Sequence, residues 1–444
     1  MAWADVAQRA SCKKAIASLN IFAAGGEKRR VRAAISGMMR FSRQHHNARK
    51  MNATRRELIM QRWNMIQHEL LPELRNDVGT LTPKLEKVIY VLEWVRIEEF
   101  TESTWSGVGR PPHERGWLAN AFVAKAVLGL TTTVGLIERL TIDRALKRIC
   151  GFPLCKRLPS EATFSRAFEA FAEGRLAERV HEALIKEHLG DELIGHISRD
   201  GTAIEARERP VYPQFATATP AAPAQSTIAP VVEGTAETST AEALAVPVRK
   251  RGRPRRGEVR LPAKESPVHH QRQQTLAQML EDIPTGCDRG TKCNAQGYKV
   301  SWNGYKLHLD TADCGVPIAA LLSSASMHDS LAAIPLSLIS AQRVTNLYDV
   351  MDAAYCSTEL RDHSRSLGHV PLIDHNPRRG EKIEFAPAEA VRYNERTVAE
   401  RSNARLKDEF GGKTILVKGE AKVMEHLMFG VLALSADQLM RLRQ

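Results

Sequence analysis

A series of short segments with the composition of β-strands most constrains the fold of this chain. Residues 193–207 are rich in β-branched side chains, residues 298–309 alternate apolar and polar side chains, and residues 316–322 are largely apolar. Further strand-like segments lie at 343–351 and 370–374. Helix-like segments separate and follow these strands, so the pattern predicts an α/β domain in the second half of the chain.

Two aspartates stand out on the predicted strands. Asp200 lies part-way along the first, and a buried acid there costs free energy unless it is paired or binds a metal. An aspartate at an edge strand or a turn is the alternative. Asp352 ends the strand at 343–351, where α/β proteins present ligands at the carboxyl edge of a sheet. Asp349 and Asp374 remain alternatives for this second acid.

A polar segment at 392–407 contains no Gly or Pro and is predicted to form one helix. At about 100° per residue, one face of that helix carries four side chains: Tyr393, Arg396, Glu400 and Lys407. A carboxylate among cations at this spacing is often only a solvated row of salt bridges. The alternative is a site that uses the carboxylate and the cations together.

The spacing of these four residues (Tyr, two residues, Arg, three residues, Glu, six residues, Lys) resembles the YREK signature of DDE transposases of insertion-sequence family four. The resemblance implies an RNase H-like mixed sheet flanked by helices, whose opening antiparallel strands are the segments at 193–207, 298–309 and 316–322. It also implies three metal-binding catalytic acids and three DNA-gripping side chains. The acids are Asp200, Asp352 and Glu400, and the DNA contacts are Tyr393, Arg396 and Lys407.

Three carboxylates of this kind suit two Mg²⁺ or Mn²⁺ ions, which prefer oxygen ligands. In such a site one ion activates water or a 3′-hydroxyl, and the other stabilises the leaving oxygen of a phosphodiester. We considered His328 and Asp329 as an acid/base pair. Neighbouring residues on a strand point to opposite faces, so we expect at most a supporting role for them.

Composition agrees with a nucleic-acid partner. The formal charge of +12 and the pI near 9.4 favour binding to a polyanion, although ribosomal and membrane-surface proteins share this balance. No apolar run approaches the roughly 18 residues of a membrane span, and the N-terminus lacks an export pattern. We therefore expect a cytoplasmic protein without a membrane partner. Its seven scattered cysteines predict neither disulfides nor a zinc site.

The first half of the chain is predicted to be all-α. Residues 1–105 form a basic helical region, and residues 113–190 form a helical DNA-binding domain. Within it, Ser160 is the expected N-cap of a helix that carries Arg166 after a loop, as in a helix-turn-helix. A plain helical bundle is the alternative, because any bundle contains such a helix pair.

The predicted catalytic domain, residues 191–444, contains a low-complexity insert at 211–270 that we expect to be disordered. The insert ends in a basic segment like an AT-hook, whose Arg251 and Arg253 suit the minor groove of A/T-rich DNA. A nonspecific basic anchor is the alternative. Beyond it we expect a polar helix at 266–282 and a loop at 286–297.

The sequence thus predicts a transposase that binds the inverted repeats of an insertion sequence and catalyses metal-dependent DNA cleavage and strand transfer. The expected partners are double-stranded DNA, at element ends and target, and a second copy of the chain in a homodimer. In a bacterial cell, DNA binding would hold the protein at the nucleoid. An RNase H-like nuclease without strand transfer and a catalytically silent DNA-binding protein are the alternatives.

Overall fold

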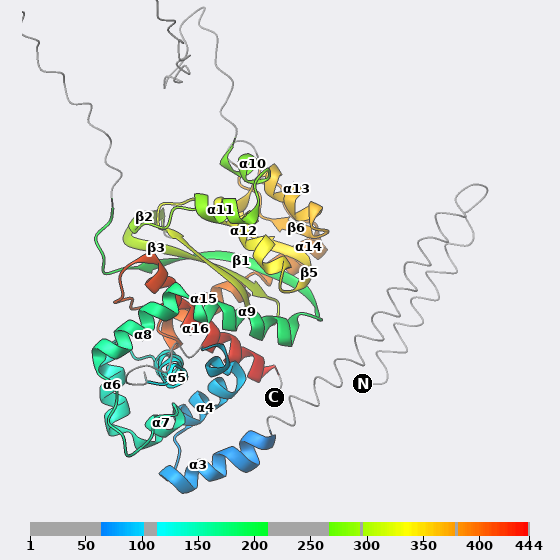
Figure 1. Cartoon of the computed structure of the whole chain (residues 1–444). Helices are drawn as coiled ribbons and strands as arrows, with labels where there is room; N and C mark the ends of the chain where they lie inside the picture. The colour runs from blue at the N-terminus through cyan, green and yellow to red at the C-terminus, as the bar shows by residue number, and fades with distance from the viewer. Residues whose placement is uncertain (1–63, 102–112, 212–265, 294–295, 378–380, 443–444) are drawn as a thin grey trace, which may run out of the picture.

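The computed structural model describes residues 64–101, 113–211, 266–293, 296–377 and 381–442. The part before the sheet is helical, as predicted (Figure 1). Its elements are a π-helix Ile66–Leu70, α3 Leu71–Val78, α4 Pro83–Val95, a 3-10 helix Ile97–Phe100, α5 Arg115–Val127, α6 Thr133–Ile142, α7 Arg144–Ile149, α8 Glu161–Glu173 and α9 Leu176–Leu189. The predicted basic segment at 1–63 lies outside the described residues.

Local sequence explains where several of these helices begin. The Thr82 side chain accepts a hydrogen bond from the backbone N–H of Leu85, and Pro83 occupies the first turn of α4, where its missing N–H costs nothing. Asp143 accepts from the N–H of Leu146 at 2.9 Å and so starts α7 separately from α6. Such N-caps satisfy backbone donors that have no partner inside the helix.

Six strands form one mixed sheet in the order β4-β3-β1-β5-β6, with β2 beside the first half of β3. The strands β1, β3 and β4 are antiparallel, whereas β5 runs parallel to β1 and β6 parallel to β5. This arrangement confirms the predicted RNase H-like α/β fold. The strands are β1 Leu193–Glu205, β2 Asp288–Cys293, β3 Lys299–Ala312, β4 Pro317–Ser324, β5 Thr345–Met351 and β6 Val370–Ile373.

Helices cover both faces of the sheet (Figure 1). One face is covered by α12 and α13, and the other by α9, α15 and α16. The helices that follow β1 are α10 Pro267–Gln271, α11 Leu276–Asp282, α12 Ser330–Ala341, a 3-10 helix Ala353–Tyr355, α13 Thr358–Ser366, α14 Pro387–Asn394, α15 Thr397–Glu409 and α16 Glu420–Arg441.

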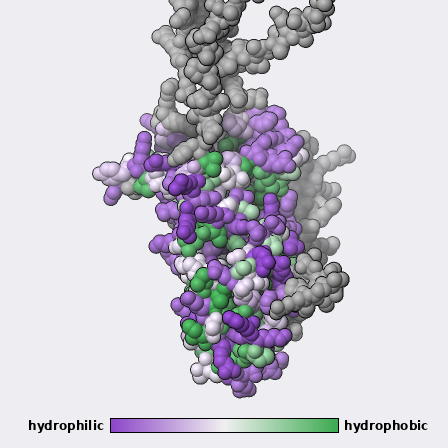
Figure 2. Space-filling view, turned by 60° about the vertical axis from the view of Figure 1, so that its left-hand side comes forward, coloured by the Kyte–Doolittle hydropathy of each residue, from purple (hydrophilic) through white to green (hydrophobic). Residues whose placement is uncertain are grey.

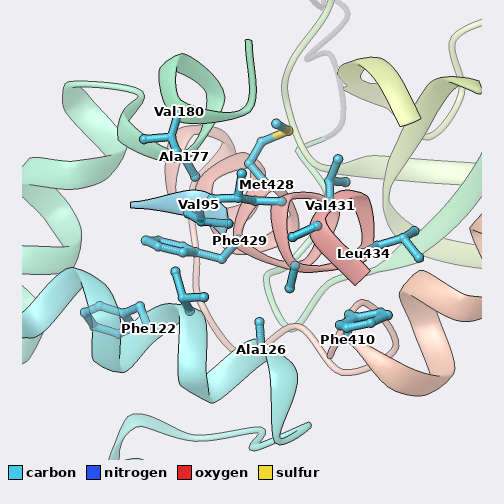
Figure 3. Packing of buried hydrophobic residues seen from close by; sticks show 14 of the residues in the cluster. Val95, Phe122, Ala126, Ala177, Val180, Phe410, Met428, Phe429, Val431 and Leu434 are labelled. Carbon is cyan, nitrogen blue, oxygen red and sulfur yellow. The ribbon is translucent and has the colours of Figure 1, made fainter. Parts of the chain in front are cut away.

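The largest hydrophobic core is shared by the helical region and the sheet. Its centre is α16, whose Phe429 packs against Phe122 of α5, with ring centroids 5.8 Å apart, and against Phe168 of α8 (Figure 3). The same cluster includes Val180 of α9 and Leu309 of β3. The last helix therefore joins the two parts of the chain, although the domain boundaries drawn from the sequence remain predictions.

Three sequence-based expectations are wrong. The helix expected at 266–282 is divided into α10 and α11, which residues 272–275 separate. Residues 288–293 form strand β2 rather than part of a loop, because their backbone pairs with residues 299–304 of β3 although their side chains lack an apolar alternation. The helix expected at 392–407 is broken into α14 and α15 around Glu395. There the backbone N–H groups of Glu395 and Arg396 bond carbonyls three residues back, which ends the regular helix. Asn394, the last residue of α14, also has a low helix propensity.

The surface alternates hydrophilic and hydrophobic residues over short distances on the face shown in Figure 2. No helix within the described ranges is long and apolar enough to cross a membrane. Most of the predicted insert, including residues 212–265 with Arg251 and Arg253, lies outside the described residues.

Candidate active site

Asp200 and Asp352 lie side by side on neighbouring parallel strands. The last paired residues of β1 and β5 are Arg199 and Met351, so the next residue of each chain segment is an aspartate. Adjacent strands are about 4.8 Å apart, and cross-strand neighbours point to the same face. The topology thus brings together two acids that are 152 residues apart in sequence, the same separation as that of the preceding residues Arg199 and Met351, which are in contact.

Both carboxylates have raised pKa values. Burial, followed by the negative charges of Asp352 and Glu400, raises the pKa of Asp200 to about 6, against the opposing effects of Arg396 and Asn403. Burial also raises the pKa of Asp352, although its carboxylate accepts a hydrogen bond from the N–H of Ala354 at 3.0 Å. Nearby cations therefore leave part of the negative charge at this edge uncompensated.

Helix α15 brings Glu400 to the same place. Glu400 lies in the first turn of α15, next to the face that packs on β1 and β3. Its carboxylate accepts a hydrogen bond from Arg396 at 2.6 Å, and its side chain is 53% exposed. The charges of Glu400 and Arg396 both reach Asp200, so the three predicted acids share one electrostatic environment.

The other members of the polar signature surround these acids despite the helix break. Tyr393 lies in the last turn of α14 and packs against Phe385 with ring centroids 4.7 Å apart, and the Arg396 guanidinium lies 6.0 Å from the centre of the tyrosine ring. Lys407 lies farther along α15, where burial lowers its pKa and the positive charge of Lys292 lowers it further. Its neighbours also include Asp200. Two cations and a phenol therefore border the acids.

The alternative acids occupy different environments. Asp349 is buried and accepts hydrogen bonds from three groups: Asn346 at 3.0 Å, Ser364, and the Nδ1 of His369 at 3.1 Å. Asp374 lies 3.2 Å from the ammonium of Lys382. Both carboxylates already have partners in the protein, which leaves Asp352 as the more available acid beside Asp200.

His328 and Asp329 have different partners, although they lie in the turn between β4 and α12 and not on a strand as expected. His328 bonds Ser330, whereas Asp329 lies 2.9 Å from the ammonium of Lys306 and faces the buried ring of His308. The negative charge of Asp329 contributes to the raised pKa of Asp352, after burial. Asp329 is thus a fourth carboxylate near the predicted three, already paired with a lysine.

The opposite face of β1 holds a closed ion pair. Arg199, one residue before Asp200, donates two hydrogen bonds of 2.7 Å to Asp310 of β3, and both side chains are buried. Ser340 of α12 also donates to Asp310 at 2.6 Å. Because consecutive strand residues point to opposite faces, this network lies directly behind the candidate site.

Asn403 is a site residue that the sequence analysis did not single out. Its Nδ2 donates to Asp200 Oδ2 at 2.9 Å, and its side chain is buried. It follows Glu400 by three residues, about one helical turn, and that spacing was a usable signal. The buried hydroxyl of Tyr355, which the negative charges of Asp329 and Asp200 reach, has no hydrogen-bond partner among the described residues.

The donor set suits a divalent cation. As the side chains are placed, no three His, Cys, Asp or Glu residues in the described ranges form a metal-ligand group, because Glu400 is turned to Arg396. Carboxylate oxygens are nevertheless the ligands that Mg²⁺ and Mn²⁺ prefer, and the pKa of Asp200, raised by burial and then by the charge of Asp352, marks a carboxylate whose charge a cation would stabilise. Asp200 and Asp352 would hold such an ion, and Glu400 would join them on leaving Arg396.

The predicted DNA contact on the helical region lies apart from these acids. Arg166 is exposed on α8, where its Nε donates to the carbonyl of Ala162 at 3.2 Å. Ser160 is the N-cap of α8, as predicted, and its hydroxyl bonds that of Thr163. DNA binding by this helix stays a prediction, as does binding through Arg251 and Arg253.

Comparison with known families gives two matches. Residues 58–170 match the model described as Transposase domain (DUF772), and residues 263–436 match the model described as Transposase DDE domain. Asp352 and Glu400 lie within the second match, and Asp200 lies between the two. No curated protein and no solved structure matches the chain. The two matches do not distinguish between insertion-sequence families, so the YREK assignment stays a prediction.

Proposed function

Since this chain is a DDE transposase of the insertion-sequence type, we propose that it binds the terminal inverted repeats of its element and catalyses metal-dependent DNA cleavage and strand transfer. DDE transposases generally use divalent metal ions and act on DNA. The finer steps proposed here, namely recognition of the repeats, cutting and joining, rest on the candidate active site.

One observation carries the proposal. Asp200 lies part-way along β1, where its pairing with β5 ends, Asp352 directly follows β5, and Glu400 approaches them from α15. Acids at the carboxyl edge of such a sheet are exposed to a ligand while the strands hold their spacing. The raised pKa of Asp200, caused by burial and then by Asp352, supports a site that gains stability from a cation.

Each side chain then has a role. Asp200, Asp352 and Glu400 hold two Mg²⁺ or Mn²⁺ ions, which would activate the attacking hydroxyl and stabilise the leaving oxygen. Arg396 and Lys407 neutralise phosphate charge next to the acids, and Tyr393 contacts the terminal nucleotide. Arg396 has a second task in this scheme, because its bond to Glu400 keeps that carboxylate compensated until an ion and DNA arrive.

The proposed partner is double-stranded DNA, both at the element ends and at the target. The helical region with Arg166 and the basic segment with Arg251 and Arg253 would add contacts outside the active site. A homodimer would hold two element ends together, since joining both ends in one event requires two active sites. Through these contacts the protein would associate with the nucleoid.

The test is cleavage of a labelled end fragment and its joining to a target plasmid in Mg²⁺ or Mn²⁺, comparing the wild type with Glu400→Ala. We expect joined product from the wild type and none from the variant, while DNA binding persists in both. Cleavage without joining would favour a nuclease. Binding without any metal-dependent chemistry on correct end DNA would leave a DNA-binding protein and overturn the proposal.

A further inference from the structure

Strands β2 and β3 continue beyond the main sheet as a two-stranded ribbon. Pairing of β3 with β1 ends at Gly304, and from there to Lys299 β3 pairs with β2, which lies on the side of β3 opposite to β1. The ring of Trp302 lies over Gly290 so closely that a Cβ added at Gly290 would be 2.4 Å from it. This packing anchors the ribbon, and the absence of a side chain at Gly290 permits it.

The ribbon is strongly cationic. Residues 289–303 contain three cations and no Asp or Glu: Arg289, Lys292 and Lys299. All three side chains are exposed, and none forms an ion pair within the described ranges. A surface charge run is usually balanced by nearby acids, so an unbalanced one indicates a polyanionic partner.

One face of the ribbon is entirely polar. Cross-strand pairing places Arg289 with Asn303, Thr291 with Ser301, and Cys293 with Lys299 on the same face. The hydroxyls of Thr291 and Ser301 lie 3.2 Å apart. Hydroxyl and amide groups between two cations are the groups that contact phosphate and sugar in protein–DNA interfaces.

The ribbon also adjoins the candidate site. The charge of Lys292 acts on Lys407, which in turn lies near Asp200. At about 3.4 Å per residue, the six-residue strand β2 is about 20 Å long. A ribbon of two strands fits the DNA major groove. Duplex DNA lying against Lys407 would therefore extend over these strands.

We propose that the β2–β3 ribbon is a DNA-binding arm that contacts the backbone of the duplex entering the active site. This role rests on the proposed function, since it takes the substrate of that site to be double-stranded DNA. The arm supplies sequence-independent affinity and leaves the chemistry to the acids. Arg289 and Lys299 contact phosphates from its polar face, and Lys292 contacts them from the opposite face, toward Lys407.

The test compares two triple variants of the full chain with equal loss of charge. One replaces Arg289, Lys292 and Lys299 with alanine, and the control replaces Lys84, Arg365 and Lys422, which lie on α4, α13 and α16. Binding of a labelled end duplex is measured by fluorescence anisotropy over a range of salt concentrations without divalent metal, so the result does not depend on cleavage.

Each lost phosphate contact should make the slope of log affinity against log salt less negative by about 0.9. We expect a change of about 2 to 3 and an affinity loss of roughly 10- to 100-fold for the ribbon variant, and less than about 3-fold for the control. Equal changes of salt slope and affinity in the two variants would overturn the DNA-binding role of the ribbon. A wild type that binds duplex but never cleaves it would overturn the transposase proposal and leave the arm standing.

Asn403 carries a second role, indicated by a different contact. Its amide links α15, which bears Glu400, to β1, which bears Asp200. The Nδ2 donor fixes one oxygen of the Asp200 carboxylate, and side chains that orient a metal-binding carboxylate in this way control its affinity for metal. We infer that Asn403 is a positioning residue, which holds the Asp200 carboxylate and its spacing to Glu400 for the divalent ion proposed above.

Ser402 offers a matched control for this role. It is buried on the same helix next to Asn403, but its hydroxyl donates to the carbonyl of Gly315 at 3.3 Å rather than to an acid. The variants are Asn403→Ala, Asn403→Leu, which preserves volume, and Ser402→Ala. The readout is Mn²⁺ binding to the full chain without DNA. Electron paramagnetic resonance measures the free and bound ion as Mn²⁺ is added.

Both Asn403 variants should bind Mn²⁺ about 10- to 100-fold more weakly than Ser402→Ala, with end-DNA affinity unchanged. High Mn²⁺ should restore the cleavage rate of Asn403→Leu. Asn403 variants that bind Mn²⁺ as tightly as the Ser402 control would overturn the positioning role. A wild type that binds no Mn²⁺ would overturn both the positioning role of Asn403 and the metal site of the proposed function. A wild type that binds Mn²⁺ but cleaves no DNA would overturn only the proposed cleavage and strand transfer.

Discussion

Arg199 and Asp200 are consecutive residues of one strand, yet their charges meet opposite conditions on the two faces of the sheet. Behind the sheet, Arg199 and Asp310 form a buried pair with two hydrogen bonds of 2.7 Å, and Ser340 adds a third. In front, the carboxylates of Asp200 and Asp352 are partly buried beside each other, and burial raises both of their pKa values. The first arrangement is complete within the protein, whereas the second requires a cation from outside.

The difference separates charges that maintain the fold from charges available for chemistry. A buried ion pair with all its partners holds β1 and β3 in register and gains nothing from a ligand. Carboxylates with too few partners destabilise the protein until something binds them. The following predictions test whether the two faces differ in this way.

The largest effect is expected on activity, from the front face. Glu400→Ala or Asp200→Ala should reduce metal-dependent cleavage by at least about 10³-fold, because a metal ligand contributes several kcal/mol of transition-state stabilisation. Arg199 and its partners are untouched, so neither substitution should lower the melting temperature much. Cleavage of a labelled end fragment measures the effect, and a fully active variant would contradict the assignment of that acid.

A comparable effect, but on stability, is expected from the rear face. Arg199→Met removes the partner of Asp310 and should lower the free energy of unfolding by about 3 to 5 kcal/mol, because an unpaired charge is then left buried. Urea unfolding followed by circular dichroism measures this loss. Combining it with Asp310→Leu should recover much of the stability. A single variant as stable as the wild type would remove the distinction between the faces.

A smaller stability change should appear in front, with the opposite sign. The folded-state pKa of Asp200 is raised from 3.8 to about 6, so the folded protein holds a proton that the unfolded chain releases between these pH values. Stability therefore falls as pH rises through this window. Asp200→Asn removes that loss and should stabilise the metal-free protein by about 1 to 3 kcal/mol at pH 8. At pH 4 the benefit should be nearly absent.

Thermal unfolding of Asp200→Asn and wild type in a chelator, at the two pH values, provides the measurement. If the melting temperatures of Asp200→Asn and the wild type differed equally at pH 4 and pH 8, the charged form of the Asp200 carboxylate would not destabilise the folded protein. Saturating Mn²⁺ should reverse the order of stability at pH 8, because only the wild type has the full ligand set.

The smallest stability effect is expected for the exposed pair at the site. Arg396→Met breaks its bond to Glu400, but an exposed pair four residues apart on a helix contributes only about 0.3 to 0.5 kcal/mol. Cleavage should nevertheless fall by roughly 10- to 100-fold, since a charge-assisted phosphate contact is lost. Unfolding and cleavage measured on one preparation distinguish the two. A large loss of stability would place Arg396 among the residues that maintain the fold.

The order of the acids could be predicted because each is marked locally. Asp200 interrupts an apolar strand, Asp352 ends one, and Glu400 belongs to a spaced polar signature. Three strands likewise followed from the segments at 193–207, 298–309 and 316–322, which occur as β1, β3 and β4, whereas their antiparallel arrangement was implied only by the family resemblance. The catalytic roles of the three acids remain predictions, but their proximity is a property of the fold.

The parts that were missed depend on partners distant in sequence. Strand β2 has no apolar alternation, and only its pairing with β3 makes it a strand. The bond between Asn403 and Asp200 joins residues 203 positions apart, so the spacing of Asn403 from Glu400 could indicate the site but could not identify its partner. The break between α14 and α15 was missed for the opposite reason, because the residues on both sides favour helix and only backbone geometry at Glu395 separates them.

Helix α16 has a consequence for how the protein is made. It follows every other described element in the chain, yet its Phe429 and neighbouring residues fill the core between the helical region and the sheet. During translation the apolar surfaces of α5, α8, α9 and β4 consequently stay uncovered until the ribosome has synthesised α16. The nascent chain completes its core only after this segment has left the ribosomal tunnel, so chaperones have a defined interval in which to bind it.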